Sequence, residues 1–195
     1  MATTFSDILN KGKQNFQTPN IAKTARDWYR KQAKNVVAVD ERQLMRKRRY
    51  KQTTQVEIGN MYMFYYDPKH KNTLPYYDKF PLIFPIDSAP GGFYGLALHY
   101  LYPTLRAKLM DHLYDLVTDT KYDKQTKLRI SYQILKNASK LYLYKPCIKH
   151  YLNNHVRSKF LYVEPKEWDI ALMLPTERFE KASNRKVWND SRRKL

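Results

Sequence analysis

The sequence predicts an α+β fold: a small antiparallel sheet or SH3-like partial barrel, packed by C-terminal helices and preceded by a basic N-terminal helical arm. Three observations lead to this prediction. β-branched and aromatic residues concentrate in the first half of the chain, between proline and glycine breaks. Apolar residues recur at helical spacing in the second half. Charge is unevenly divided along the chain, with a neutral middle between two basic segments.

These observations divide the 195 residues into two parts. We expect a basic arm over residues 1–54, with one or two helices. A compact domain should cover residues 55–195, with the sheet at 55–102 and helices at 104–190. A chain of this length can bury a hydrophobic core without disulfides, and a hydrophobic content of 43% argues against global disorder.

The arm should begin irregularly, because residues 1–20 are polar and contain a Thr-Pro break. A helix should follow from about Ile21, since Ile21, Ala25 and Trp28 fall on one face and Asn20 is a suitable cap. The opposite face of this helix is basic. The densest basic run of the chain comes next, in "ERQLMRKRRYK".

The sheet should form from two or three antiparallel strands. Strand-forming residues fill "QVEIGNMYMFYY", which carries a Gly-Asn turn, and "LPYYDKFPLIFPID". The second segment contains Pro75, Pro81 and Pro85, so we predict an edge strand or an extended segment there, because proline lacks the ladder donor. A turn is expected in "SAPGGFYG".

The remainder of the chain should be mostly helical. Apolar stripes predict helices in "TLRAKLMDHLYDLV", "KQTKLRISYQILKNASKL" and "KPCIKHYLNNHVRSKF". Two shorter helices are expected in "EPKEWDIALML" and "TERFEKASNRKVWNDS", separated by Pro175.

Net charge points to a polyanionic partner. The chain has 36 Lys and Arg against 18 Asp and Glu, a net of +18, which folding does not require. Nucleic acid is the first candidate and an anionic membrane the second, and we favour nucleic acid without a membrane partner. No apolar stretch approaches the roughly 18 residues of a membrane span. The single cysteine excludes an internal disulfide and suits a reducing cytoplasm, and the N-terminus lacks the apolar core of a secretory signal.

No motif in the sequence specifies an enzyme. Cys147, His150 and His155 have borderline zinc spacing, but a second pair of ligands is missing. A catalytic Cys–His pair is possible in principle, although Cys147 should pack inside a predicted helix. A metal-dependent nuclease would need clustered carboxylates; the spacing of Asp67, Asp78 and Asp87 specifies no such site, and turn formation explains Asp67 and Asp87 equally well. We therefore expect a non-enzymatic protein without a metal or cofactor.

The aromatic block of residues 61–87 has two interpretations. Its Tyr and Phe rings could form a platform for single-stranded bases, with stacking worth ~1–3 kcal/mol per base. They could instead form the core of the sheet. We favour the core, because the middle of the chain is neutral whereas such platforms normally lie in positive grooves.

The basic flanks are the better candidates for binding nucleic acid. Mixed Lys and Arg without a base-reading motif indicates contacts to the phosphate backbone rather than sequence readout. The predicted nucleic-acid-binding residues are Arg30, Lys31, Lys34, Arg42, Arg46, Lys47, Arg48, Arg49, Lys51, Lys121, Lys124, Lys127, Arg129, Lys136, Lys140, Arg157, Lys159, Arg192 and Arg193. A merely soluble basic surface is the alternative.

Three blocks of the chain resemble a known group of proteins. They are "LPYYDKFPLIFPID" with "GGFYGLALHYL", then "YKPCIKHYLNNHVRSKF", then "EWDIALMLPTERF" with "KVWNDSRRKL". Over roughly residues 55–195 these blocks resemble proteins of large contractile-tailed bacteriophages of the T-even type. The resemblance implies a role in phage DNA replication, recombination or packaging, or in the virion, and it implies no catalytic residues.

Together these arguments predict a non-enzymatic nucleic-acid-binding protein that holds the phosphate backbone, with DNA favoured, in phage DNA metabolism or packaging. Its location should be the cytoplasm of the bacterial host cell, or the virion. The alternative is a virion or assembly protein whose basic arm and aromatic surface dock on other phage proteins or on the genome.

Overall fold

The computed structural model describes residues 5–15, 23–46, 50–119 and 121–193. Its α-helices are α1 (Phe5–Asn15), α2 (Lys23–Lys34), α3 (Glu41–Arg46), α4 (Pro103–Thr118), α5 (Lys124–Lys140), α6 (Trp168–Ala171) and α7 (Asn184–Arg193). Short 3-10 helices are η1 (Leu98–Tyr100), η2 (Tyr142–Cys147), η3 (Asn153–His155) and η4 (Pro165–Glu167). None of the helices in these ranges combines the length and apolar character that crossing a membrane requires.

The sheet is antiparallel throughout. Its strands are β1 (Gln52–Thr53), β2 (Met61–Met63), β4 (Leu82–Ala89), β5 (Gly92–Ala97), β6 (Ile148–Leu152) and β7 (Phe160–Val163). They lie in the order β1-β7-β2-β4-β5-β6, and β3 (Tyr77–Asp78) pairs separately with β8 (Phe179–Glu180). The predicted α+β class with an antiparallel sheet is confirmed, and within the described residues β1 and β6 form open edges rather than closing a barrel.

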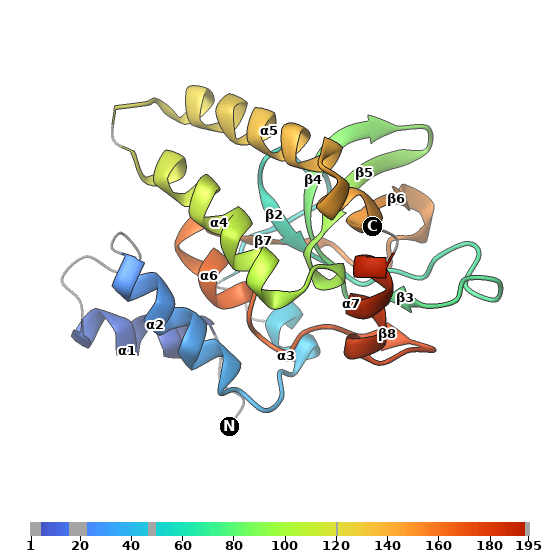
Figure 1. Ribbon diagram of the computed structural model, residues 1–195, viewed down its shortest axis with the longest axis horizontal. Coiled ribbons are helices and arrows are strands. Elements are labelled where there is room, and N and C mark those ends of the chain that lie inside the picture. Colours follow the sequence, from blue (N-terminus) through green and yellow to red (C-terminus); the bar gives the residue numbers. More distant parts are fainter. Residues whose placement is uncertain (1–4, 16–22, 47–49, 120, 194–195) are drawn as a thin grey trace.

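The helices form two groups (Figure 1). α4 and α5 run side by side, and α5 contacts β4, whereas α1 and α2 contact each other and reach α6 on the other side of α4. A single apolar cluster joins all these layers, from Phe5 in α1 to Val187 in α7. The helices predicted near α2, α4 and α5 are present. Asp123 caps the N-terminus of α5, where its side chain accepts hydrogen bonds from the backbone N–H groups of Gln125 and Thr126.

The first helix lies in a segment where we predicted irregular chain. α1 buries Phe5, Ile8 and Leu9, which recur at helical spacing. Gly12 continues this face, and a Cβ built there would lie 2.0 Å from the hydroxyl oxygen of the buried Tyr29. The absence of a side chain at Gly12 therefore lets α1 pack closely against α2.

The strand β4 is central, so the prediction of an edge strand or extended segment is wrong for residues 82–89, whereas β3 of the same segment pairs only with β8 within the described residues. β4 pairs with β2 on one side and with β5 on the other. Proline is tolerated because the register shifts between Pro85 and Asp87, and a bulge is a place where a ladder donor can be missing. The turn between β4 and β5 contains Gly91 at a φ of 71°, as its glycine content predicts.

The helix predicted over "KPCIKHYLNNHVRSKF" is also wrong, because this segment forms η2, β6 and η3. β6 pairs with β5, whose glycines allow the close approach. A Cβ at Gly92 would lie 1.8 Å from the carbonyl oxygen of Tyr151, and one at Gly95 would lie 3.1 Å from the Tyr151 ring. The last two predicted helices are present but shorter than their segments. α6 has four residues, and α7 has ten because the start of its segment forms β8.

Candidate nucleic-acid interface

The predicted basic residues divide into buried, exposed and undescribed side chains. Lys47, Arg48 and Arg49 lie outside the described residues, as do the side chains of Lys124, Lys127 and Arg193. Arg30 is buried. The exposed residues are Lys31, Lys34, Arg42, Arg46, Lys51, Lys121, Arg129, Lys136, Lys140, Arg157, Lys159 and Arg192.

The Arg30 side chain forms an internal ion-pair network. Its guanidinium lies 2.6 Å from Oδ1 of Asp169 in α6 and 2.8 Å from Oδ1 of Asp111 in α4. Arg26 lies 3.8 Å from the same Asp111 oxygen and is also buried. Burial raises the pKa of the Asp169 carboxyl, although the charge of Arg30 opposes this. Arg30 therefore connects α2 to α4 and α6, and of the predicted binding residues on this helix only Lys31 and Lys34 are exposed.

The exposed basic residues of α5 share one face. Arg129, Lys136 and Lys140 are spaced by seven and four residues, which places them within about 40° of each other around a helix. We call them the basic stripe of α5. The Lys136 ammonium donates a hydrogen bond to the Tyr132 hydroxyl at 2.8 Å, which raises the pKa of Lys136 and keeps it charged.

A second group of cations lies at the β1 edge of the sheet. Lys51 precedes β1 and accepts the backbone N–H of Tyr162 at 2.8 Å, while its ammonium lies 5.4 Å from the Tyr162 ring centroid. Lys159 precedes β7, and with Lys51 it lines a hollow of about 460 Å³. We call Lys51 and Lys159 the basic edge. The C-terminus of α3 lies beside it, because Gln52 donates to the Met45 carbonyl, so Arg46 is close to this edge and Arg42 is one turn away.

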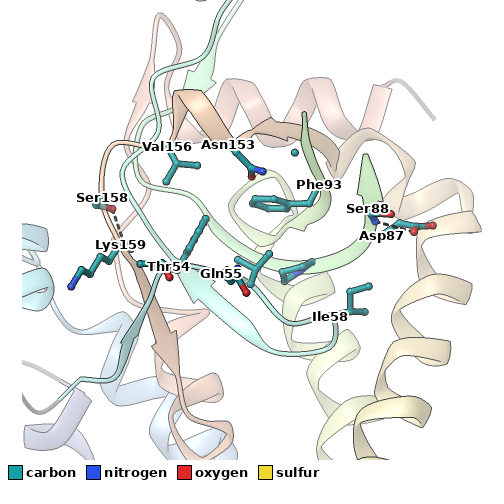
Figure 2. Close-up of a pocket in the computed structure, with 14 residues that line it drawn as sticks. Thr54, Gln55, Ile58, Asp87, Ser88, Phe93, Asn153, Val156, Ser158 and Lys159 are labelled. Carbon is teal, nitrogen blue, oxygen red and sulfur yellow. Dashed lines mark hydrogen bonds between the residues drawn. The ribbon is translucent and has the colours of Figure 1, made fainter. Parts of the chain in front are cut away.

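A larger cleft of about 870 Å³ lies beside the basic edge and includes Lys159 in its lining (Figure 2). Lys159 borders the cleft at one end, next to the loop that follows β1. Asp87 borders the other end, and its Oδ2 lies 3.8 Å from the Lys136 ammonium of α5. The fold thus places Lys159 at one end of the cleft and Lys136, which is far from it in sequence, beside Asp87 at the other end.

The other predicted cations lie elsewhere. Arg157 lies 3.7 Å from Asp67 and 3.4 Å from the Asn154 carbonyl oxygen. Arg192 of α7 lies over the Tyr102 ring, 5.3 Å from its centroid. Lys121 precedes α5, and Lys31 and Lys34 lie on α2, on the far side of α4 from α5 (Figure 1).

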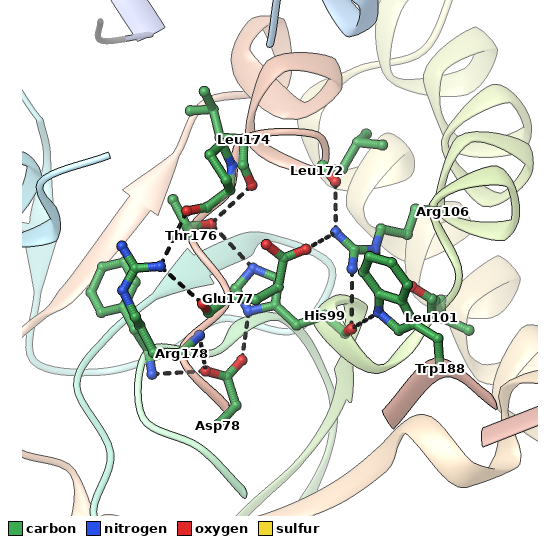
Figure 3. Close-up of polar contacts among 12 residues, drawn as sticks. Asp78, His99, Leu101, Arg106, Leu172, Leu174, Thr176, Glu177, Arg178 and Trp188 are labelled. Atoms are coloured by element: carbon green, nitrogen blue, oxygen red, sulfur yellow. Dashed lines mark hydrogen bonds and ion pairs between the residues drawn. The ribbon is translucent and has the colours of Figure 1, made fainter. Parts of the chain in front are cut away.

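A buried polar network joins Asp78 of β3, His99 of η1 and Thr176 (Figure 3). His99 Nδ1 lies 2.5 Å from Oδ2 of Asp78, and His99 Nε2 lies 3.2 Å from the Thr176 hydroxyl oxygen. This order of carboxylate, imidazole and hydroxyl resembles the triad of hydrolases. Thr176 and His99 are both 0% exposed, however, so no substrate can reach the hydroxyl in this structure.

Arg106 connects the same network to α4. Its guanidinium donates to Glu177 at 2.7 Å and to the carbonyl oxygens of Leu101, Leu172 and His99. Trp188 of α7 also donates to the His99 carbonyl oxygen, at 2.8 Å. These hydrogen bonds connect η1, α4, α7 and the segment after α6, so the network stabilises the packing of these elements.

The residues considered for metal or thiol chemistry are dispersed. Cys147 is 0% exposed, and burial raises the pKa of its thiol to about 12. His150 donates from Nε2 to the Pro90 carbonyl oxygen (3.1 Å), and His155 lies 2.8 Å from the Asp67 carbonyl oxygen. In the part of the chain that the structure describes, no three His, Cys, Asp or Glu side chains are grouped to hold a metal ion.

The aromatic block forms core, as predicted. Tyr62, Phe64, Phe80 and Phe84 are at most 1% exposed, and Phe64 contacts Phe160 edge-on at a centroid distance of 4.9 Å. Because these rings are buried, they are not available as the aromatic docking surface of the assembly hypothesis. The cleft itself was not predicted, because its walls come from loops at residues 54–58 and 153–160 that carry no recognisable motif.

Comparison with known proteins adds one finding. No curated protein and no solved structure matches the chain. A family model does match, over residues 5–191, and it describes the phage T4 terminal DNA protecting protein. The match covers nearly the whole chain, and it agrees with the resemblance to T-even phage proteins and with a DNA-associated role. The chain therefore belongs to the family of the phage T4 terminal DNA protecting protein.

Proposed function

We propose that this protein binds the ends of phage DNA and shields them, by holding the phosphate backbone with the basic stripe of α5 and the basic edge. The observation that carries the proposal is membership of a family described by terminal DNA protection in a chain with a net charge of +18. Lys and Arg contacts to phosphates supply most of non-specific DNA affinity and release counterions on binding.

The geometry supports backbone contacts on both sides of the cleft. Lys136 of the basic stripe lies 3.8 Å from Asp87 at one end of the cleft, and Lys159 of the basic edge lines the other end. A DNA end placed across this surface would meet cations on both sides, which suits contact with both strands. Such contacts position DNA without reading its sequence, so binding should be independent of base composition.

We propose further that binding is not coupled to catalysis. The groups that most resemble catalytic residues are buried: Thr176 and His99 are 0% exposed, and Cys147 is buried with its thiol pKa raised. The proposed function needs a stable complex rather than turnover. We expect it to act in the host cytoplasm, on DNA that enters or leaves the virion.

Assembly with other phage proteins is the second candidate function. Its specific support is the exposure of Leu141 and Tyr142 directly after α5, which are 56% and 55% exposed. Sedimentation after nuclease treatment separates the two functions. Self-association that survives nuclease and high salt would favour assembly, and co-purification of DNA that nuclease removes would favour DNA binding.

Exonuclease protection tests the main proposal. A linear duplex labelled at one end should survive exonuclease longer when the protein is added, and covalently closed circles of equal mass should compete poorly. Equal competition by circles would reject end binding while leaving DNA binding in place. Failure to retain any DNA at 50 mM salt would reject the proposal altogether.

A further inference from the structure

The cleft beside the basic edge has the dimensions of a small-ligand site. Its volume of about 870 Å³ lies within the roughly 300–1,000 Å³ typical of such sites. It opens over the end of the β4–β5 hairpin and is bordered by loops on both sides (Figure 2). A nucleotide is small enough to enter, whereas a base-paired duplex end is not.

The interior of the cleft combines aromatic rings with neutral polar groups. Phe93 and Phe160 contribute rings that the surrounding core holds in place, since Phe93 stacks on Tyr151 at a centroid distance of 5.6 Å. Gln55 and Asn153 line opposite walls, and both carry amide donors and acceptors. Both rings are buried, at 6% and 5% exposed, so they form an apolar floor against which a base could rest while the amides bond to its edge.

One wall is held rigidly by backbone hydrogen bonds. The N–H of Asn153 donates to the Gly91 carbonyl at 2.9 Å, and that of Arg157 donates to the Tyr65 carbonyl at 2.8 Å. The Ser158 hydroxyl accepts the N–H of Tyr65 at 2.9 Å. This wall therefore exists before any ligand binds, and ordering it costs no additional free energy on binding.

The charges at the two ends of the cleft differ in sign. Of the residues that line the cleft, Lys159 lies at the end next to the basic edge, with its ammonium pointing outward (Figure 2), and Asp87 lies at the other end. A phosphate is attracted by Lys159 and repelled by Asp87, whereas the exocyclic amino group of a base can donate to the Asp87 carboxylate. A nucleotide would therefore lie with its phosphate towards Lys159 and its base towards Asp87.

We propose that this cleft takes the base of an unpaired nucleotide at the end of a DNA strand. The inference rests on the proposed function, since end binding brings such a nucleotide to the basic edge. It adds a reason for preferring ends, because a base in continuous duplex is paired and stacked and is not available to the cleft. DNA bound only through the phosphate backbone would show no such preference.

Fluorescence of 2-aminopurine tests the inference. Two duplexes carry this base, one as a single unpaired terminal nucleotide and the other at an internal paired position. A third duplex has both ends closed by hairpins. The terminal probe should change its fluorescence on binding and the internal probe should not. The duplex with the unpaired nucleotide should bind roughly 5- to 150-fold more tightly than the closed duplex, the range typical of coupling between two binding contacts.

Two adjacent asparagines provide matched variants. Asn153 lines the cleft and Asn154 does not, and both are exposed. Asn153→Trp should fill the cleft, abolish the terminal fluorescence change and reduce binding to the level of the closed duplex, while Asn154→Trp should behave as the parent protein. Gln55→Ala, on the opposite wall, should weaken the same preference, and thermal unfolding confirms that each variant is folded.

The outcomes distinguish the inference from the proposed function. Equal affinity for all three duplexes, or a terminal preference that Asn153→Trp and Gln55→Ala leave intact, would overturn the cleft assignment while DNA binding remains. Loss of binding to every duplex by the parent protein would overturn both.

Discussion

The two basic helices α2 and α5 use their positive charge in different ways. In α2, Arg26 and Arg30 are buried, and Arg30 pairs with Asp111 and Asp169. In α5, the described basic side chains are exposed, and Lys136 lies 3.8 Å from Asp87 and donates a hydrogen bond to Tyr132. This comparison indicates that a basic residue in a helix stabilises the fold when its side chain is buried and paired. It is available to a ligand when its side chain is exposed.

Physical chemistry explains why the two helices should respond differently to substitution. A buried ion pair that loses one partner leaves an unpaired charge, which costs about 3–5 kcal/mol. An exposed pair is screened by water and contributes about 0–1 kcal/mol. Changes in α2 should therefore affect stability, and changes in α5 should affect DNA binding.

Replacing Arg30 tests the comparison most severely. Arg30→Met removes the guanidinium from Asp169, whose side chain is 1% exposed, and should lower the free energy of unfolding by about 3–5 kcal/mol. Urea denaturation measures the loss. Lys31→Met, on the outer face of the same helix, is the control and should change stability by less than about 0.5 kcal/mol. A loss of DNA affinity in Arg30→Met without a loss of stability would show that Arg30 faces the ligand.

The buried ion pair between Arg106 and Glu177 gives a second test, because its contribution to stability depends on pH. Burial by itself raises the pKa of the Glu177 carboxyl, but the charges of Arg106 and His99 outweigh it, so the pKa is lower than in the unfolded chain. Stability from this group is therefore complete above the ordinary glutamate pKa and is lost as pH falls through the lowered value.

Glu177→Gln should therefore destabilise the protein at neutral pH by about 1.5–3 kcal/mol and flatten the loss of stability on acidification. The cost should be below that of Arg30→Met, because Arg106 retains its bonds to three carbonyl oxygens. Urea denaturation at a series of pH values measures both effects. An unchanged pH dependence would contradict the assignment of this pair.

The packing of α1 against α2 offers a test without charge. Gly12→Ala places a Cβ against the buried Tyr29 ring and should destabilise the protein by about 1–3 kcal/mol. At an exposed helix position the same change would stabilise by up to about 1 kcal/mol, so the sign of the effect is diagnostic. Thermal unfolding measures the sign of the effect, and Lys11→Ala at the exposed neighbouring position is the control. A gain in stability would mean that α1 does not pack as described.

The smallest effect on stability is expected in α5. The double variant Lys136→Gln and Lys140→Gln should unfold within about 0.5 kcal/mol of the parent protein, because both side chains are exposed. Its affinity for linear DNA should nevertheless fall by a similar factor for every sequence. Unchanged affinity in a gel-shift titration would remove the basic stripe from the interface.

Part of the fold follows from sequence pattern and part does not. α2, α4 and α5 show clear helical periodicity, and the aromatic block indicates a sheet. β6 was mistaken for a helix because Ile148, Tyr151 and Leu152 satisfy a helical spacing over so short a segment, and only the glycines of β5 explain its pairing. α1 carried a helical pattern in Phe5, Ile8 and Leu9 that a break-based interpretation overlooked.

The candidate site was less predictable than the fold. Lysines on α5 and beside β7 were identified from composition, but their arrangement around a cleft depends on tertiary contacts such as that between Lys136 and Asp87. Burial of Arg30 could have been anticipated, since it recurs with Arg26 and Ala33 on the face of Tyr29. The triad-like grouping of Asp78, His99 and Thr176 unites distant segments, and no local pattern foretells it.

The salt dependence of affinity for a linear duplex tests the central claim most directly. If Lys51, Arg129, Lys136, Lys140 and Lys159 each neutralise one phosphate, log K should fall against log salt with a slope near or beyond about −4.5. The α5 double variant should reduce that slope by about 1.8, and Arg30→Met should leave it unchanged. A flat slope for the parent protein, or a slope that responds to Arg30 and ignores α5, would contradict the division of charge between the two helices.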